Sequence, residues 1–125
     1  MTEQIKDWTN QVIGAAIEVH RQLGPGLLER TYEECLFIEL RERKIEVERQ
    51  VKLPIEYRGH RIDDAYRLDL LVQRSLVVEL KTVEKIAPVH RAQLLTYLRF
   101  GNFKYGLLFN FHEAMLRDGL VRVIN

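Results

Sequence analysis

The stretch from Leu68 to Lys81 restricts the fold more than any other part of the chain. It consists of two short apolar runs joined by a polar turn centred on Arg74, and this pattern predicts two antiparallel strands. Successive side chains of a strand point to opposite faces, so Glu79 and Lys81 lie on one face of the second strand. With the turn at Arg74, Asp69 of the first strand lies directly opposite Glu79.

This arrangement predicts a site that needs a cation. Cβ atoms of directly opposed residues are roughly 4.5–5.5 Å apart, and like charges at that separation are destabilising. Asp69 and Glu79 therefore need compensation, for which a divalent metal is the natural candidate. Lys81 is a solvated edge residue in one interpretation. In the other, its ammonium orients and helps to deprotonate a water that attacks phosphorus, while the metal stabilises the added charge.

The composition predicts one domain, over residues 1–125, because 46% hydrophobic content is enough for a core. The 19 basic and 18 acidic residues nearly cancel, so net charge gives no argument for non-specific nucleic-acid binding. Cys35 is the single cysteine, which excludes an intrachain disulfide and indicates a reducing compartment. There is neither a secretory signal pattern nor an apolar run near the ~20 residues of a membrane span. We expect a soluble, cytoplasmic protein without membrane contact.

Hydrophobic periodicity predicts the element order α-α-β-β-β-α-β-β. A first helix ends at Gly24-Pro25-Gly26, and a second begins near residue 28. Alternation from residue 45 to 57 predicts a long strand, in which Pro54 indicates an edge position or a bulge. A turn at Arg58-Gly59-His60 leads into the next strand. Further elements are expected at residues 76–81 (strand), 88–101 (helix), 104–110 (strand) and 120–124 (strand).

Several polar residues lie on otherwise apolar helix faces. Glu29 shares a face with Tyr32, and it is either a functional acid or a first-turn residue that interacts with the helix dipole. Gln93 and Tyr97 are one helical turn apart, and they form either a functional pair or an amphipathic edge. His20 could approach Glu29, but a structural hydrogen bond is the preferred interpretation.

These residues together resemble the PD-(D/E)XK nuclease superfamily. Its signature is an acid on the second core strand followed by (D/E)-x-K on the third, which Asp69 and Glu79-Leu80-Lys81 match in order and spacing. The whole chain also resembles the small GxxExxY proteins, since Gly26-Leu27-Leu28-Glu29-Arg30-Thr31-Tyr32 carries that motif. Further stretches that resemble this family are Glu18–Gly26, Ala92–Leu98 and Gly106–Phe111.

The resemblance implies an α/β fold with a restriction-endonuclease-like core of order α-β-β-β-α-β. Its mixed central sheet would be flanked by helices, with an extra helix at the N-terminus. It implies a Mg²⁺- or Mn²⁺-dependent nuclease that hydrolyses phosphodiester bonds in nucleic acid, DNA in preference to RNA. The implied metal ligands are Glu29, Asp69, Glu79 and the Leu80 backbone carbonyl, the implied catalytic residues are these acids with Lys81 and Gln93, and the supporting residues are Tyr97, His20 and Tyr32.

Two alternatives remain open at this stage. The fold could serve as a catalytically silent module that binds nucleic acid or a protein partner, which near-zero net charge favours. It could also be a structural homo-oligomer in which the acidic pair is a core feature. The presence of Glu29, Asp69, Glu79 and Lys81 together favours the enzyme, because a binding module does not need all four.

Overall fold

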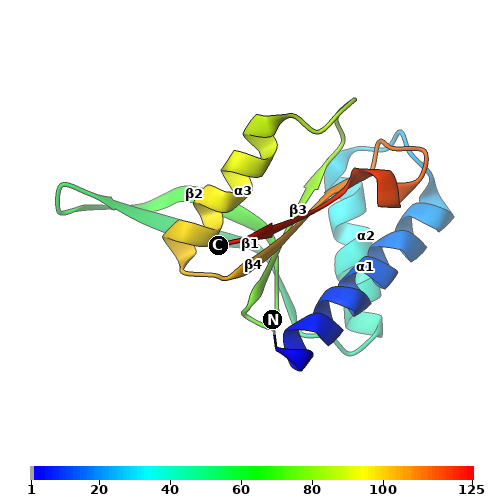
Figure 1. Cartoon of the computed structure of the whole chain (residues 1–125), viewed down its shortest axis with the longest axis horizontal. Helices are drawn as coiled ribbons and strands as arrows, with labels where there is room; N and C mark the ends of the chain where they lie inside the picture. The colour runs from blue at the N-terminus through cyan, green and yellow to red at the C-terminus, as the bar shows by residue number, and fades with distance from the viewer. Residues whose placement is uncertain (1) are drawn as a thin grey trace.

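The protein is an α/β structure in which one sheet is covered by helices on both faces (Figure 1). The structure, a computed structural model, describes residues 2–125. The elements are α1 (Glu3–Leu23), α2 (Glu29–Glu42), β1 (Val47–Tyr57), β2 (His60–Val72), β3 (Leu76–Lys81), α3 (Pro88–Gly101), β4 (Tyr105–Asn110), a 3-10 turn η1 (Leu116–Gly119) and β5 (Leu120–Ile124). The predicted fold class and element order are therefore confirmed.

The sheet has the order β1-β2-β3-β4-β5 and is mixed. β3 and β4 are parallel, because α3 carries the chain across one face between them, and the other neighbours are antiparallel. In Figure 1, α1 and α2 lie on one side of the sheet and α3 lies on the other. β3 is thus the central strand, buried on both faces, and it carries Glu79 and Lys81.

The hairpin of β1 and β2 projects from the body as an arm (Figure 1). Its strands turn at Arg58 and Gly59, both at positive φ, as the sequence predicts. β1 is an edge strand, and its register with β2 shifts between Leu53 and Ile55. Pro54 lies at this shift, where its missing N–H costs the ladder no hydrogen bond. Both the edge position and the irregularity that Pro54 indicated are confirmed.

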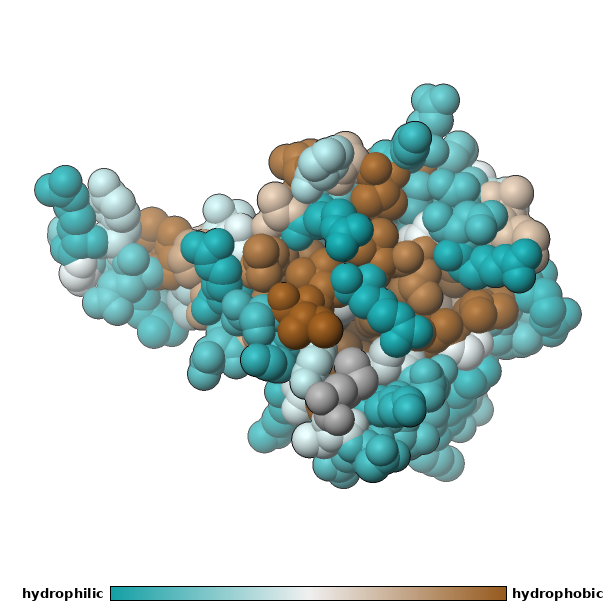
Figure 2. Space-filling view, in the orientation of Figure 1, coloured by the Kyte–Doolittle hydropathy of each residue, from teal (hydrophilic) through white to brown (hydrophobic). Residues whose placement is uncertain are grey.

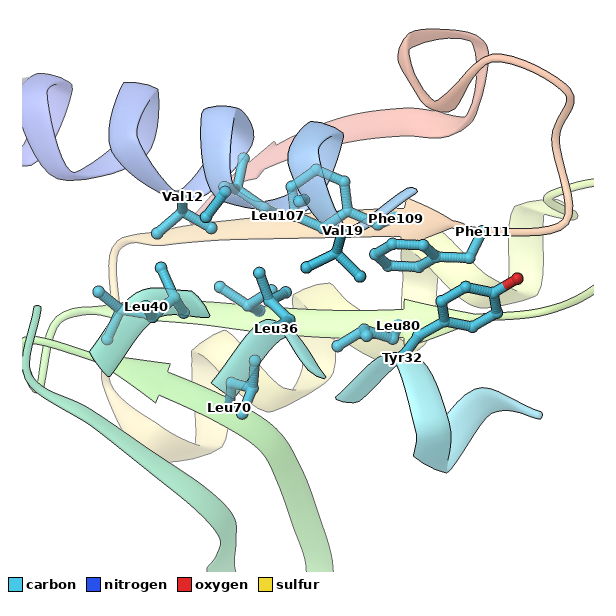
Figure 3. Close-up of a cluster of buried hydrophobic side chains, with 14 of the residues drawn as sticks. Val12, Val19, Tyr32, Leu36, Leu40, Leu70, Leu80, Leu107, Phe109 and Phe111 are labelled. Atoms are coloured by element: carbon cyan, nitrogen blue, oxygen red, sulfur yellow. The ribbon is translucent and has the colours of Figure 1, made fainter. Parts of the chain in front are cut away.

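The core has one layer on each face of the sheet. Between the sheet and α1/α2, Tyr32 stacks on Phe111 with ring centroids 4.5 Å apart, in the cluster that Figure 3 shows. On the α3 face, Leu94 and Leu98 pack against buried residues of the strands. Within residues 2–125, no helix is long and apolar enough to cross a membrane.

The buried residues of α3 give a stability prediction. Leu98 is fully buried, so Leu98→Ala should lower the free energy of unfolding by roughly 2–5 kcal/mol. Leu95, which the helical pattern also marks as apolar, is only partly buried, and Leu95→Ala should cost less. Urea denaturation of both variants measures the difference, and equal losses would contradict this description of the α3 core.

Candidate active site

Asp69 and Glu79 meet where β2 leaves β3. The main-chain pairing of the two strands ends at Leu70 and Val78, with the offset that the sequence predicts. Beyond this pair the side chains replace the ladder. The Asp69 N–H donates to Glu79 Oε2 at 2.7 Å, and the Leu80 N–H donates to Asp69 Oδ2 at 2.9 Å. Asp69 and Glu79 thus meet through bonds from each carboxylate to the opposite backbone and not through the main-chain ladder, because β2 turns away into the arm.

Desolvation disfavours the ionised form of both carboxylates. Desolvation, with the nearby charges of Glu33 and Glu29, raises the pKa of Asp69 to about 6, although the Leu80 hydrogen bond opposes the rise. Glu79 is almost completely buried, and desolvation followed by the charge of Asp69 raises its pKa well above its usual range. At neutral pH the pair therefore favours a bound proton or a bound cation.

Lys81 and Gln93 complete this side of the site. Both Glu79 and Lys81 point from β3 toward the α3 face of the sheet, and Lys81 Nζ donates to Gln93 Oε1 at 3.2 Å. The positive charge of Lys81 favours the ionised forms of Asp69 and Glu79, which lowers their pKa values against the effect of burial. The structure thus brings four predicted residues together: Asp69, Glu79, Lys81 and Gln93.

Tyr97 lies one turn beyond Gln93 and is buried next to the acids. Desolvation, followed by the charges of Glu79 and Asp69, raises the pKa of its phenol to about 12. Tyr97 therefore remains a neutral hydroxyl at neutral pH, with a ring that borders the carboxylates.

Glu29 approaches the site from the other helical layer. Gly24 and Gly26 have φ values of 71° and 99°, which suit glycine and fold the chain sharply before α2. The Tyr32 hydroxyl fixes this turn, since it donates to the Gly24 carbonyl and accepts from the Leu27 N–H at 3.1 Å. The turn places Glu29 in the first turn of α2. Gly26, Glu29 and Tyr32 thus lie in or next to one turn, and each has its own role there.

The charge of Glu29 reaches the site, but its side chain is not part of a close cluster. Desolvation raises the pKa of Glu29, Lys81 lowers it and Glu33 raises it further. Among residues 2–125, no group of three or more His, Cys, Asp or Glu is arranged to hold a metal ion. The close pair is Asp69 with Glu79, and Glu29 remains an exposed residue beside it.

The other predicted supporting residues have structural partners. The ring of Tyr32 is buried in the core. His20 Nε2 lies 2.8 Å from the Glu113 carbonyl oxygen, and its imidazole is close to Phe111. This is the structural hydrogen bond preferred for His20 from the sequence. Leu80 places its side chain in the core and its N–H on Asp69, and the role of its carbonyl stays a prediction.

Glu33 is a residue of the site that the sequence interpretation missed. It is buried, and it accepts hydrogen bonds from Arg49 Nη2 at 3.1 Å and from Gln50 Nε2 at 2.6 Å. Gln50 has a positive φ of 50°, so a local irregularity of β1 turns its amide toward α2. The one available signal was the spacing of four residues from Glu29, which puts both acids on one helix face.

Asn110 was also missed, and it supports the loop that follows Lys81. Its side chain is fully buried at the end of β4, opposite Lys81 in the register. Asn110 Nδ2 donates to the Val83 carbonyl at 2.8 Å, and its Oδ1 accepts from the Val83 N–H at 3.1 Å. Asn110 therefore fixes the path of the chain between Lys81 and α3. A polar residue that ends an apolar strand was the available signal.

The carboxylate pair fits a hard divalent cation. Each hydrogen bond uses one oxygen of its carboxylate, so Asp69 Oδ1 and Glu79 Oε1 are not part of these bonds. Mg²⁺ in nucleic-acid and nucleotide enzymes is commonly bound by one or two carboxylates, with waters and substrate phosphates as the other ligands. Asp69 Oδ1 and Glu79 Oε1 would supply the two carboxylate oxygens of this donor set without a third close acid.

The raised pKa of Asp69 gives a pH prediction for the metal-free protein. The pKa of Asp69 is about 6 in the folded protein, above its unfolded value of about 3.9. Protonated Asp69 therefore stabilises the fold fully below pH ~4, and this stabilisation is lost as pH rises through about 6. Asp69→Asn removes this titration and keeps an oxygen for the Leu80 N–H. In chelator, the free energy of unfolding of Asp69→Asn should therefore rise by about 1–3 kcal/mol relative to that of wild type between pH 4 and pH 7.

Urea denaturation across this pH range measures the difference. Asp118→Asn, which changes an exposed acid in η1, is the control and should run parallel to wild type. A constant difference between wild type and Asp69→Asn, or a growing advantage of wild type, would show that the buried carboxylate is compensated by its own neighbours.

Comparison with known proteins agrees with this geometry. Residues 6–123 match the sequence profile described as the PD-(D/E)XK nuclease superfamily. No curated protein and no solved structure matches the chain. The match covers nearly the whole sequence, including α2, the β2–β3 pair and α3. The chain therefore belongs to the PD-(D/E)XK nuclease superfamily.

Proposed function

We propose that the protein is a metal-dependent nuclease that hydrolyses phosphodiester bonds in nucleic acid, with DNA preferred to RNA. The observation that carries this proposal is the meeting of Asp69, Glu79, Lys81 and Gln93 at the end of β3. Nucleases of this superfamily typically use a divalent metal ion. A buried acid and a partly buried acid beside a lysine and a glutamine are costly for stability, and hydrolysis of a phosphodiester would give all four residues a function.

In the proposed site, Asp69 and Glu79 would hold Mg²⁺ or Mn²⁺ with help from the Leu80 carbonyl. When bound, the ion would supply Lewis-acid stabilisation of charge on the phosphate and would favour ionisation of a nearby water. Glu29 contributes its charge from α2, as a further ligand or as support for a second ion.

Lys81 acts on the water and the phosphate in this proposal. Its ammonium lies on the same face as Glu79 and donates hydrogen bonds to the attacking oxygen or to a phosphate oxygen. These bonds favour ionisation of the attacking water and stabilise the negative charge of the transition state. Gln93 acts on Lys81, because its Oε1 accepts a hydrogen bond from Nζ and so restricts the ammonium to this side of the sheet. No covalent intermediate is needed.

We also propose that the chain is one of the GxxExxY proteins within the superfamily. Gly26, Glu29 and Tyr32 occupy the three motif positions. The structure gives each a separate reason, namely positive φ, a first-turn acid and a hydroxyl that fixes the turn. The motif would therefore serve to deliver one glutamate from α2 to the edge of the site.

One observation favours a second function, a nuclease fold that binds nucleic acid without turnover. Within the described residues, Glu29 does not join Asp69 and Glu79 in a close three-acid group. A site with two acids binds metal less tightly than one with three, so turnover could be lost while strand binding remains. Cleavage measured against binding separates the two functions.

The catalytic assignment is tested with Lys81→Ala. The variant should lose cleavage of DNA in Mg²⁺ or Mn²⁺ by about 10²–10⁴, because it removes the group that acts on water. It should keep the rise in melting temperature that millimolar Mn²⁺ gives, since Asp69 and Glu79 remain. Lys85→Ala, which removes an exposed lysine from the following loop, is the matched control and should cleave as wild type does.

Two outcomes would contradict the assignment. Cleavage that survives in both Lys81→Ala and Glu79→Ala arises from another site. If wild type cleaves neither single-stranded, duplex nor branched nucleic acid in either metal, the binding function replaces the nuclease.

A further inference from the structure

Three aromatic residues pack together at the root of the arm, and two of them expose their rings there. The rings of Tyr66 on β2 and Tyr97 on α3 have centroids 5.3 Å apart. Tyr66 also stacks on Phe100, with centroids 6.3 Å apart and ring planes inclined by 14°. Tyr97 is buried, whereas Tyr66 is 37% exposed and Phe100 is 51% exposed. Figure 2 shows hydrophobic residues near the root of the arm, next to its hydrophilic tip.

This aromatic surface begins at the candidate active site. Gln93, Tyr97 and Phe100 are spaced by four and three residues, so they form one row along α3. The first member of the row binds Lys81, and the last is in contact with Tyr66. Tyr66 itself precedes Asp69 by three residues on β2. The exposed rings of Phe100 and Tyr66 therefore lie about two helical turns along α3 from the residue that binds Lys81.

We propose that Tyr66 and Phe100, supported by Tyr97, are a base-stacking surface, and that the substrate is a nucleic-acid strand with unpaired bases. This inference deepens the proposed function, because it names the substrate of the same site. Aromatic side chains stack on bases of single strands without regard to sequence. In a duplex both faces of each base are already stacked, so exposed rings beside the scissile position select unpaired nucleotides.

The surroundings of the row leave a path for a strand. α3 contains no acidic residue, and its exposed Arg91 and Arg99 lie at least about 100° around the helix from each member of the row. An open hollow of about 350 Å³ lies beside Phe100, lined also by Pro54, Ile55, Glu56 and Arg61 of the arm. A strand that passes from the carboxylates over Tyr66 and Phe100 would reach this hollow between helix and arm.

The test measures binding separately from cleavage. Fluorescence anisotropy would compare labelled single-stranded DNA, single-stranded RNA, a duplex and an abasic single strand of equal length. All proteins carry Lys81→Ala, so that the strands stay intact, and all measurements are made in Mn²⁺. We expect single strands with bases to bind more tightly than either the duplex or the abasic strand. The DNA and RNA arms identify which strand is preferred.

The variants test the rings themselves. Tyr66→Ala and Phe100→Ala should each weaken single-strand binding by about 5- to 100-fold, with little effect on the abasic strand. Tyr66→Phe keeps the ring and should bind like the parent protein. Tyr57→Ala removes another exposed aromatic residue, at the tip of the arm beneath Arg58, and is the matched control.

The outcomes distinguish this inference from the proposed function. If wild type cleaves nucleic acid but Tyr66→Ala and Phe100→Ala bind single strands as Tyr57→Ala does, the stacking surface is wrong and the nuclease stands. If these variants instead turn a dimer into a monomer with unchanged strand binding, the surface is a self-association interface and the inference is also wrong. If Tyr66→Ala and Phe100→Ala selectively lose single-strand binding while wild type cleaves nothing, the stacking surface is supported and the proposed nuclease function is wrong. Absence of all binding and cleavage overturns both.

Discussion

The exchange of hydrogen bonds between Asp69 and Glu79 is the interaction on which the rest of this structure depends. Each carboxylate accepts an N–H from the opposite strand, so the β2–β3 junction is held by side chains where the main-chain ladder stops. The two strands can separate beyond that point without leaving their amides unbonded. The same bonds fix two acids side by side in a largely apolar sheet, where both pKa values rise. Structural support and electrostatic cost are therefore properties of the same four groups.

The layers of the fold add one chemical group each to this junction. α3 covers one face of the sheet and supplies Gln93 to Lys81, while α2 on the other face supplies Glu29 from a turn fixed by Tyr32. β2 continues past Asp69 into the arm, which carries Tyr66 onto the α3 row. The site is thus assembled from both helical layers and the arm. In the proposed function, a strand of nucleic acid would lie along the line where β2 departs, and its unpaired bases would stack on the aromatic rings of Tyr66 and Phe100.

The sequence predicted what depends on local pattern, and it missed what depends on packing between elements. Alternation and turn chemistry were enough to place Asp69 near Glu79 and both on the face of Lys81, because strand register follows from the turn. The burial of Glu33 was not predictable, since it depends on an irregular β1 residue, Gln50, that turns toward α2. The contact of Tyr66 with α3 likewise depends on the path of the arm, and hydrophobic periodicity does not predict that path. Helical spacing also gives the apolar stripe of α3 but not the depth of each residue in the core, so the partial burial of Leu95 was not predictable either.

The central claim is that Asp69 and Glu79 together bind one divalent metal ion. Paramagnetic Mn²⁺ added to ¹⁵N-labelled protein tests it most directly. The Asp69 N–H donates to the Glu79 carboxylate and the Leu80 N–H donates to the Asp69 carboxylate, so both amides lie next to the proposed ion. Substoichiometric Mn²⁺ should broaden these two amide signals first and leave those of the arm tip sharp. Glu79→Gln should abolish the selective broadening. Uniform weak broadening over the surface, or unchanged Asp69 and Leu80 signals at millimolar Mn²⁺, would contradict the metal site.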